Sequence, residues 1–311
     1  MNEKSLVLAT CSHKKAVILY DLATYDGENL DNSEVWSFEL PYDYFPGGGI
    51  AAVKYRENTV FGDVVIVCAG HNGYAAIISY PDKKILWEVF NCGANAHAIE
   101  ILPSGNIVAA SSHGCVLRLF ASSAMLSGDT KKAASYREYP LVNGHGVLWD
   151  PKYQVLWALG GDTLRAYSVT GEGTEEELTL RKDLGCELRG MDGHDLSADF
   201  QDSEYLWVTS HKHVYHFRKE TSELLTEYQH DHVLDHPNVK GFGNHPEGKY
   251  YFSVPDFGKG TWWEGKGFCS WSTDRIHFGK PDETGDALKL CECISKSNAF
   301  YKIFSFYGKY Q

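Results

Sequence analysis

Short apolar runs of strand length, separated by turns and polar segments, recur along this 311-residue chain. Three stretches repeat one arrangement: a histidine, an apolar run directly after it, and then a second and a third run. They are HAIEILPSGNIVAASSHGCVLRLF from His97, HGVLWDPKYQVLWALGGDTLRAYS from His145 and HDLSADFQDSEYLWVTSHKHVYHF from His194. The leading histidines are 48 and 49 residues apart. A period of this length built from short strands is typical of a β-propeller, in which each repeat forms one blade.

The repeat extends in both directions. Lys240 heads KGFGNHPEGKYYFSVPD, 46 residues after His194, and takes the place of the leading histidine. Upstream, residues 47–90 form another unit with Ala51 near that position. The N-terminus supplies SLVLATC, AVILYDL and VWSFEL, three strands without a first one, and the C-terminus supplies a single strand, AFYKIFSFYG. We therefore predict one all-β domain over residues 1–311, a six-bladed propeller whose first blade is closed by the C-terminal strand. Seven blades are the alternative, although no seventh pair of second and third strands is found.

Composition and charge disfavour nucleic acids and membranes as binding partners. The formal net charge of −12 and a pI near 5.6 disfavour a nucleic-acid-binding protein, which needs a basic face, and no apolar run reaches membrane-spanning length. The N-terminus lacks a basic region and a signal-peptidase site, so we expect a cytoplasmic protein, with a secreted protein that has lost its leader as the alternative. The eight cysteines fit reduced thiols, and the Cys291-Glu-Cys293 pair alone does not specify a metal or redox role.

Propeller geometry places the predicted functional residues together. In a four-stranded blade, the loop that enters the first strand and the turn between the second and third strands lie on the same face. The three leading histidines should therefore share a face with residues of those turns. The turn residues are His13, His71, His113, Asp162 and His211, and a longer turn in the sixth blade carries Trp262 and Trp263.

These residue types suggest a site for a small acidic sugar. Neutral imidazoles of His97, His145 and His194 around a narrow axis would bind a divalent metal ion such as manganese, zinc, iron or nickel. Lys240 beside them favours an anionic ligand. The remaining predicted substrate contacts are Trp262 and Trp263, whose rings could stack on a sugar, and His71 and His113. The alternative interpretation is structural: a histidine at the start of an inner strand can simply hydrogen-bond the backbone and fix blade packing.

The phrases HAIEILPSGNIVAAS, GHGVLWDPKYQVLWALG and GHDLSADFQDSEYLWVTS resemble a family of bacterial proteins of unknown function, DUF6528, over nearly the whole chain. The resemblance implies a propeller of about this size and supplies no activity. The histidine arrangement is also similar, as an analogy of fold and site alone, to propeller-fold oligogalacturonate lyases, in which histidines hold a manganese ion.

Our functional hypothesis is a metal-dependent lyase that acts on a uronate-containing sugar at the mouth of the central channel. His97, His145 and His194 would hold the metal ion, and His211 or Lys240 would remove the proton next to the substrate carboxylate. A hydrolase or epimerase using the same site stays open. So does a non-catalytic propeller that binds a glycan or a protein partner.

Overall fold

The computed structural model describes most of the chain in detail. The described residues are 5–12, 14–40, 49–70, 73–122, 135–256, 271–282, 284 and 287–310. Three of the predicted site residues, His71, Trp262 and Trp263, lie outside them, as does His13.

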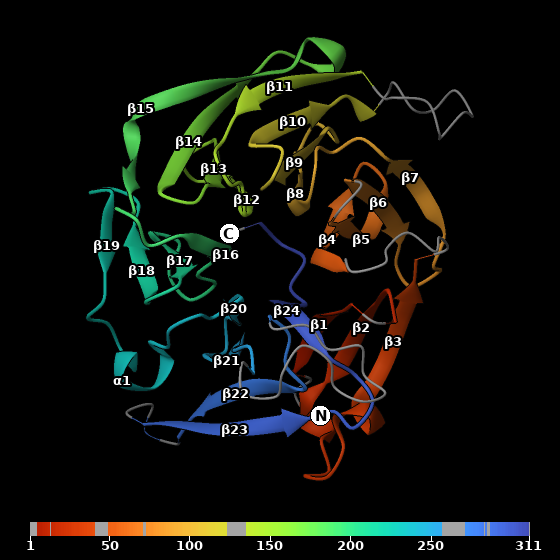
Figure 1. Cartoon of the computed structure of the whole chain (residues 1–311), viewed down its shortest axis with the longest axis vertical. Coiled ribbons are helices and arrows are strands. Elements are labelled where there is room, and N and C mark those ends of the chain that lie inside the picture. The colour runs from red at the N-terminus through yellow and green to blue at the C-terminus, as the bar shows by residue number, and fades with distance from the viewer. Residues whose placement is uncertain are drawn as a thin grey trace.

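The described strands form six antiparallel sheets of four strands, arranged as blades around a common axis (Figure 1). Blade 1 contains β24 (Phe300–Ser305), β1 (Leu6–Cys11), β2 (Ala16–Asp21) and β3 (Glu34–Glu39). Blade 2 contains β4 (Ile50–Thr59), β5 (Gly62–Ala69), β6 (Tyr74–Ser79) and β7 (Ile85–Val89). Blade 3 contains β8 (Ala96–Ile101), β9 (Ile107–Ser111), β10 (Val116–Phe120) and β11 (Tyr136–Pro140). Blade 4 contains β12 (Gly146–Asp150), β13 (Val155–Leu159), β14 (Thr163–Thr170) and β15 (Glu177–Glu187). Blade 5 contains β16 (Gly193–Ala198), β17 (Tyr205–Ser210), β18 (Val214–Arg218) and β19 (Glu223–Leu225). Blade 6 contains β20 (Gly241–Asn244), β21 (Tyr250–Ser253), β22 (Arg275–Pro281) and β23 (Leu288–Ile294).

Helical segments are few and short within the described residues. They are η1 (Leu22–Thr24), η2 (Leu30–Ser33), η4 (Gly173–Glu175) and α1 (Asp231–Leu234). None of these helices has the length and apolar character that crossing a bilayer requires.

The ring closes in the predicted way. Strand β24 pairs with β1 in antiparallel register, with Ala9 opposite Ile303 and Cys11 opposite Phe300. The Thr10 hydroxyl donates to the Lys302 carbonyl oxygen at 3.2 Å, and the Lys302 amide donates back to that hydroxyl at 3.0 Å. Strand β24 also contacts β20 of the sixth blade and β4 of the second. The prediction of a six-bladed propeller closed by the C-terminal strand is therefore confirmed, and no sheet edge faces a gap between these blades.

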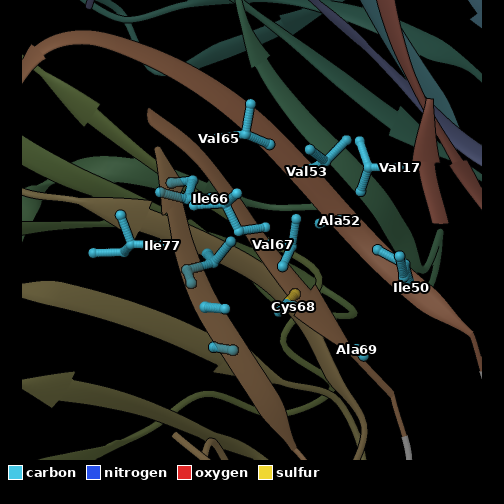
Figure 2. Close-up of a cluster of buried hydrophobic side chains, with 14 of the residues drawn as sticks. Val17, Ile50, Ala52, Val53, Val65, Ile66, Val67, Cys68, Ala69 and Ile77 are labelled. Carbon is cyan, nitrogen blue, oxygen red and sulfur yellow. The ribbon is translucent and has the colours of Figure 1, made fainter. Parts of the chain in front are cut away.

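Apolar side chains fill the space between neighbouring blades. Second strands read as continuous apolar runs because both of their faces are covered, as in VVIVCA of β5, which is buried from Val64 to Ala69. Figure 2 shows this packing between the first and second blades, where Val17 of β2 lies near Val53 of β4. The core is thus distributed around the ring, and the inner strands are free to carry polar residues at the axis.

Buried ion pairs occupy the axis itself. Glu100 of β8 accepts from Lys54 Nζ at 3.0 Å and from Arg56 Nη2 at 2.6 Å, so two cations share one carboxylate. On the other side, Lys302 Nζ of β24 lies 3.1 Å from Asp195 Oδ1 of β16 and 3.3 Å from the His145 carbonyl oxygen. Across these five groups positive charge exceeds negative charge by one, which makes the centre of the propeller electropositive.

Candidate functional site

A short local repeat turns the chain into the inner strand of four consecutive blades. An asparagine or aspartate comes two residues before each leading residue, and all four adopt left-handed backbone angles. They are Asn95 (φ 60°), Asn143 (φ 50°), Asp192 (φ 49°) and Asn238 (φ 63°), ahead of His97, His145, His194 and Lys240. Asn and Asp tolerate this conformation better than other residues with a side chain. The repeat therefore places a leading residue at the same backbone position in each of these four blades.

The four leading residues line a single cavity of about 380 Å³ at one mouth of the central channel. A cavity of this size lies within the range of small-molecule sites. Its wall also includes Asp192, Ser112, His113, Trp271 and Tyr301. The predicted convergence of the three histidines and Lys240 is thus observed, and His113 lies in the same cavity wall.

His97 and His145 are held by their own backbone. Nδ1 of His97 lies 3.0 Å from the Asn95 carbonyl oxygen, and Nδ1 of His145 lies 2.8 Å from the Asn143 carbonyl oxygen. A carbonyl oxygen only accepts, so Nδ1 carries the proton in both rings. Burial, followed by the charge of Lys302, lowers the pKa of His97 to about 3. Burial, followed by the neighbouring His97 ring, lowers the pKa of His145 well below its usual value. Both imidazoles are therefore neutral at physiological pH.

His194 has different contacts from the other two. Its Nε2 atom lies 2.7 Å from Lys240 Nζ and 3.2 Å from His211 Nδ1, so it accepts a hydrogen bond from one of them. Its Nδ1 atom is buried and has no hydrogen-bond partner among the described residues. Burial, followed by the charge of Lys240, lowers the pKa of His194 to about 2. A buried polar atom without a partner is costly, and a functional role is one reason why such a cost is tolerated.

Asp192 and His211 complete a compact group with His194. Asp192 Oδ2 lies 3.0 Å from His211 Nε2, while Asp192 Oδ1 accepts from the Asn143 amide at 2.7 Å. Asn238 Oδ1 lies 2.9 Å from His211 Nδ1. One ligand atom from each of Asp192, His194 and His211 lies within 4.8 Å of the others. A carboxylate and two imidazoles, oriented by two asparagines, are a donor set that suits zinc, manganese, iron or nickel.

The candidate metal-binding group in the structure overlaps the predicted ligands only in part. The rings of His97 and His145 have centroids 4.5 Å apart, and those of His145 and His194 are 5.7 Å apart. Within the described residues, however, the group close enough to share a metal ion is the Asp192 group, which retains only His194 of the predicted three. His211, predicted as a base, belongs to that group, so Lys240 is the remaining candidate for proton transfer.

Lys240 makes this end of the cavity cationic. Its side chain is buried, and burial, followed by the charge of Lys302, lowers its pKa to about 8. An ammonium group in a concave, poorly hydrated site attracts an anionic ligand, while the lowered pKa keeps a fraction of the amine unprotonated near neutral pH.

Sequence reasoning missed several residues of the cavity, among them Asp192, Tyr301 and Trp271. Asp192 was detectable, because it stands where Asn95 and Asn143 stand in the preceding repeats. Tyr301 of β24 and Trp271, which is 49% exposed, come from segments outside the repeat pattern. The predicted stacking residues Trp262 and Trp263, and the predicted contact His71, fall outside the described residues.

Comparison with solved structures agrees with the architecture. A functionally unknown protein from Desulfotomaculum acetoxidans DSM 771 matches 98% of this chain and 80% of its own, with a TM-score of 0.54 and 11% identity. A structure described as a putative 6-phosphogluconolactonase from Bacteroides uniformis matches over 97% and 99%, with a TM-score of 0.58 and 10% identity. A protein of unknown function from Bacteroides caccae matches over 97% and 98%, with a TM-score of 0.56 and 12% identity. At these identities the likeness shows the fold alone.

Among curated proteins, the search found no match to this sequence. The family described as "Family of unknown function (DUF6528)" matches residues 1–270, which is most of the chain. Together with the observed propeller, this match confirms the resemblance seen in the sequence: the chain belongs to the DUF6528 family.

Proposed function

We propose that this protein is a metal-dependent enzyme that acts on a small acidic sugar, and that it eliminates a proton and a leaving group next to a uronate carboxylate. One observation carries the proposal. Asp192 and His194 of the cavity wall form a group of metal-ligating type with His211, and Lys240 of the same wall contacts His194. An elimination of this kind needs metal ligands, a cationic group and a cavity on the same face of the protein, and this site combines the three.

Asp192, His194 and His211 would hold the metal ion. A divalent ion there supplies Lewis-acid stabilisation of the negative charge that develops on the substrate carboxylate. Asn143 and Asn238 hold the carboxylate of Asp192 and the ring of His211 in place through the hydrogen bonds described above. Such outer contacts fix ligand orientation and are as much a part of the site as the ligands.

Lys240 is the residue placed to move the proton. Its unprotonated amine takes the proton from the carbon next to the carboxylate, the electron pair of that C–H bond forms a C=C bond, and the C–O bond to the leaving group breaks. The leaving oxygen then takes up a proton. Burial and Lys302 favour the unprotonated amine by lowering the pKa of Lys240 to about 8.

Two further features favour a sugar acid. The ammonium group of Lys240 in the cavity wall attracts an anion to this mouth of the channel. The half-exposed Trp271 and the ring of Tyr301 offer apolar faces against which a sugar ring can stack. The Bacteroides uniformis structure, described as a putative 6-phosphogluconolactonase, is consistent with a sugar-related role.

The test combines metal analysis with turnover. Purified protein should bind about one equivalent of zinc or manganese, and metal-loaded protein should produce ultraviolet-absorbing unsaturated products from uronides. Lys240→Met should bind the metal and lose turnover. Protein that binds no divalent ion, or metal-loaded protein that leaves every uronide unchanged, would refute the lyase. Conversion without unsaturated products would instead identify a hydrolase or an epimerase.

A second candidate is a non-catalytic propeller that binds an acidic glycan. It is favoured by the hydrogen bonds that Asp192 and His211 make to each other, to Asn143 and to Asn238, which alone can hold these side chains in place. This candidate requires that a chelator leave the melting temperature unchanged, whereas a metal bound only by the folded state raises it.

A further inference from the structure

His97 and His145 form a pair of neutral acceptors in the cavity, separate from the compact ligand group. Their Nδ1 protons are donated to the carbonyl oxygens of Asn95 and Asn143, as described above. In a neutral imidazole the other nitrogen is then an acceptor and cannot donate. Neither Nε2 atom has a hydrogen-bond partner in the part of the chain that the structure describes. The pair thus presents two unused acceptors to any ligand in the cavity.

The backbone fixes the orientation of this pair. The carbonyl groups that hold the rings belong to residues in the left-handed conformation, and the carbonyl of His145 itself accepts from Lys302 Nζ at 3.3 Å. The two rings lie edge to face, with centroids 4.5 Å apart and an angle of 62° between their planes. Because the rings are held before a ligand arrives, little side-chain entropy remains to be lost on binding.

A pair of acceptors requires either two neutral donors or a cation. The surroundings disfavour a cation, because Lys302 places positive charge next to the rings and the pair, unlike the Asp192 group, includes no carboxylate. A metal ion would also need a third and a fourth ligand. Asp192 is the only acidic residue among the described residues of the cavity wall, and it belongs with His194 and His211. Neutral hydroxyl groups meet neither objection.

We propose that His97 and His145 bind two hydroxyl groups on adjacent carbon atoms of the ligand, so that the cavity selects sugars with a vicinal diol. The proposal deepens the proposed function by naming a substrate feature, and depends on it only for placing the ligand in this cavity. The acid group would then lie toward Lys240 and His194, and the diol toward His97 and His145. Two hydroxyls on neighbouring carbons lie close enough together to reach two rings in edge-to-face contact.

The test uses two small probes of identical composition, cis-cyclohexane-1,2-diol and cis-cyclohexane-1,4-diol, with chelator-treated protein. Ligand-observed NMR titration should give about fivefold tighter binding of the 1,2-diol, the preference expected from one additional hydrogen bond. His97→Phe and His145→Phe keep the ring shape, remove the acceptor and should abolish the preference. His232→Phe, on the exposed helix α1 away from the cavity wall, is the matched control and should keep it.

Three results would overturn the proposal: equal binding of the two diols to the wild-type protein, binding of neither, or a preference that survives in both phenylalanine variants. The wild-type comparison needs no variant, so poor folding of a variant leaves the test decisive. Zinc binding that persists in Asp192→Asn and disappears in His145→Phe would also overturn it, because the pair would then bind metal. Absence of metal binding or turnover, with the diol preference intact, would count against the proposed lyase alone.

Discussion

Replacing Lys302 by methionine tests the buried ion pair beneath the cavity. The substitution keeps the length of the side chain and removes its ammonium group. Nζ lies 3.1 Å from Asp195 Oδ1, and both side chains are almost fully buried. Two charges at that separation interact by about 5 kcal/mol at an effective dielectric constant of about 20. Removing one partner of a buried pair typically costs about 3–5 kcal/mol, because the other charge stays buried. We therefore expect Lys302→Met to lower the free energy of unfolding by about 3–5 kcal/mol.

Urea denaturation followed by tryptophan fluorescence measures this loss. The double variant Lys302→Met/Asp195→Leu removes both charges and should recover most of the stability, since an apolar pair can replace a buried ion pair. Lys152→Met is the surface control. It breaks the solvent-exposed ion pair with Glu204 and should leave the stability almost unchanged. A Lys302→Met protein within about 1 kcal/mol of the wild type, or a double variant no more stable than the single one, would refute the reasoning.

Three further predictions concern the cavity. Asp192→Asn should weaken zinc binding by at least roughly 10–100-fold, which is the usual effect of losing a residue that only orients a metal ligand. Competition with a chromogenic chelator measures this affinity, and an unchanged value would contradict the ligand assignment. Lys240→Met should reduce turnover of a uronide by at least about 100-fold, the lower end of the contribution of a general base, while zinc binding by equilibrium dialysis persists; retained turnover would assign the proton transfer elsewhere. The pKa of His97 is about 3 in the folded chain against an ordinary 6.5, so the unfolded chain binds more protons between these values. The contribution of His97 to the free energy of unfolding should be fully present above pH 6.5 and should fall toward pH 3, by up to about 1.4 kcal/mol per pH unit. Urea denaturation at a series of pH values should therefore show a weaker pH dependence of stability for His97→Gln than for the wild type.

The fold was predictable because the period was visible. The intervals between His97, His145, His194 and Lys240 set the phase of the blades, and the phase placed these residues around one axis. The unmatched strands at the two ends of the sequence predicted the closure by β24. These inferences depend only on chain connectivity and strand periodicity, which the order of residues contains directly.

The candidate metal-binding group was less predictable because equivalent positions carry differently oriented rings. His97 and His145 turn Nδ1 to a carbonyl two residues earlier, whereas Nε2 of His194 is taken by Lys240 and His211. That difference arises from Lys240 of the next blade and from His211 in a turn of the same blade, contacts that the repeat does not encode. Asp192 could have been found from the recurring Asn or Asp two residues before each leading residue. Trp271 could not, because it lies beyond any repeated segment.

The joint between β24 and β1 has a consequence for how the site comes into being. On a ribosome β24 emerges after every other strand of the ring, and it carries Tyr301 of the cavity wall and the Lys302 that supports His145 from below. Until β24 is synthesised, the first blade lacks its inner strand and the ring cannot close. Binding competence is therefore acquired in one late step, and an interrupted translation product would yield an unclosed ring that cannot engage ligand.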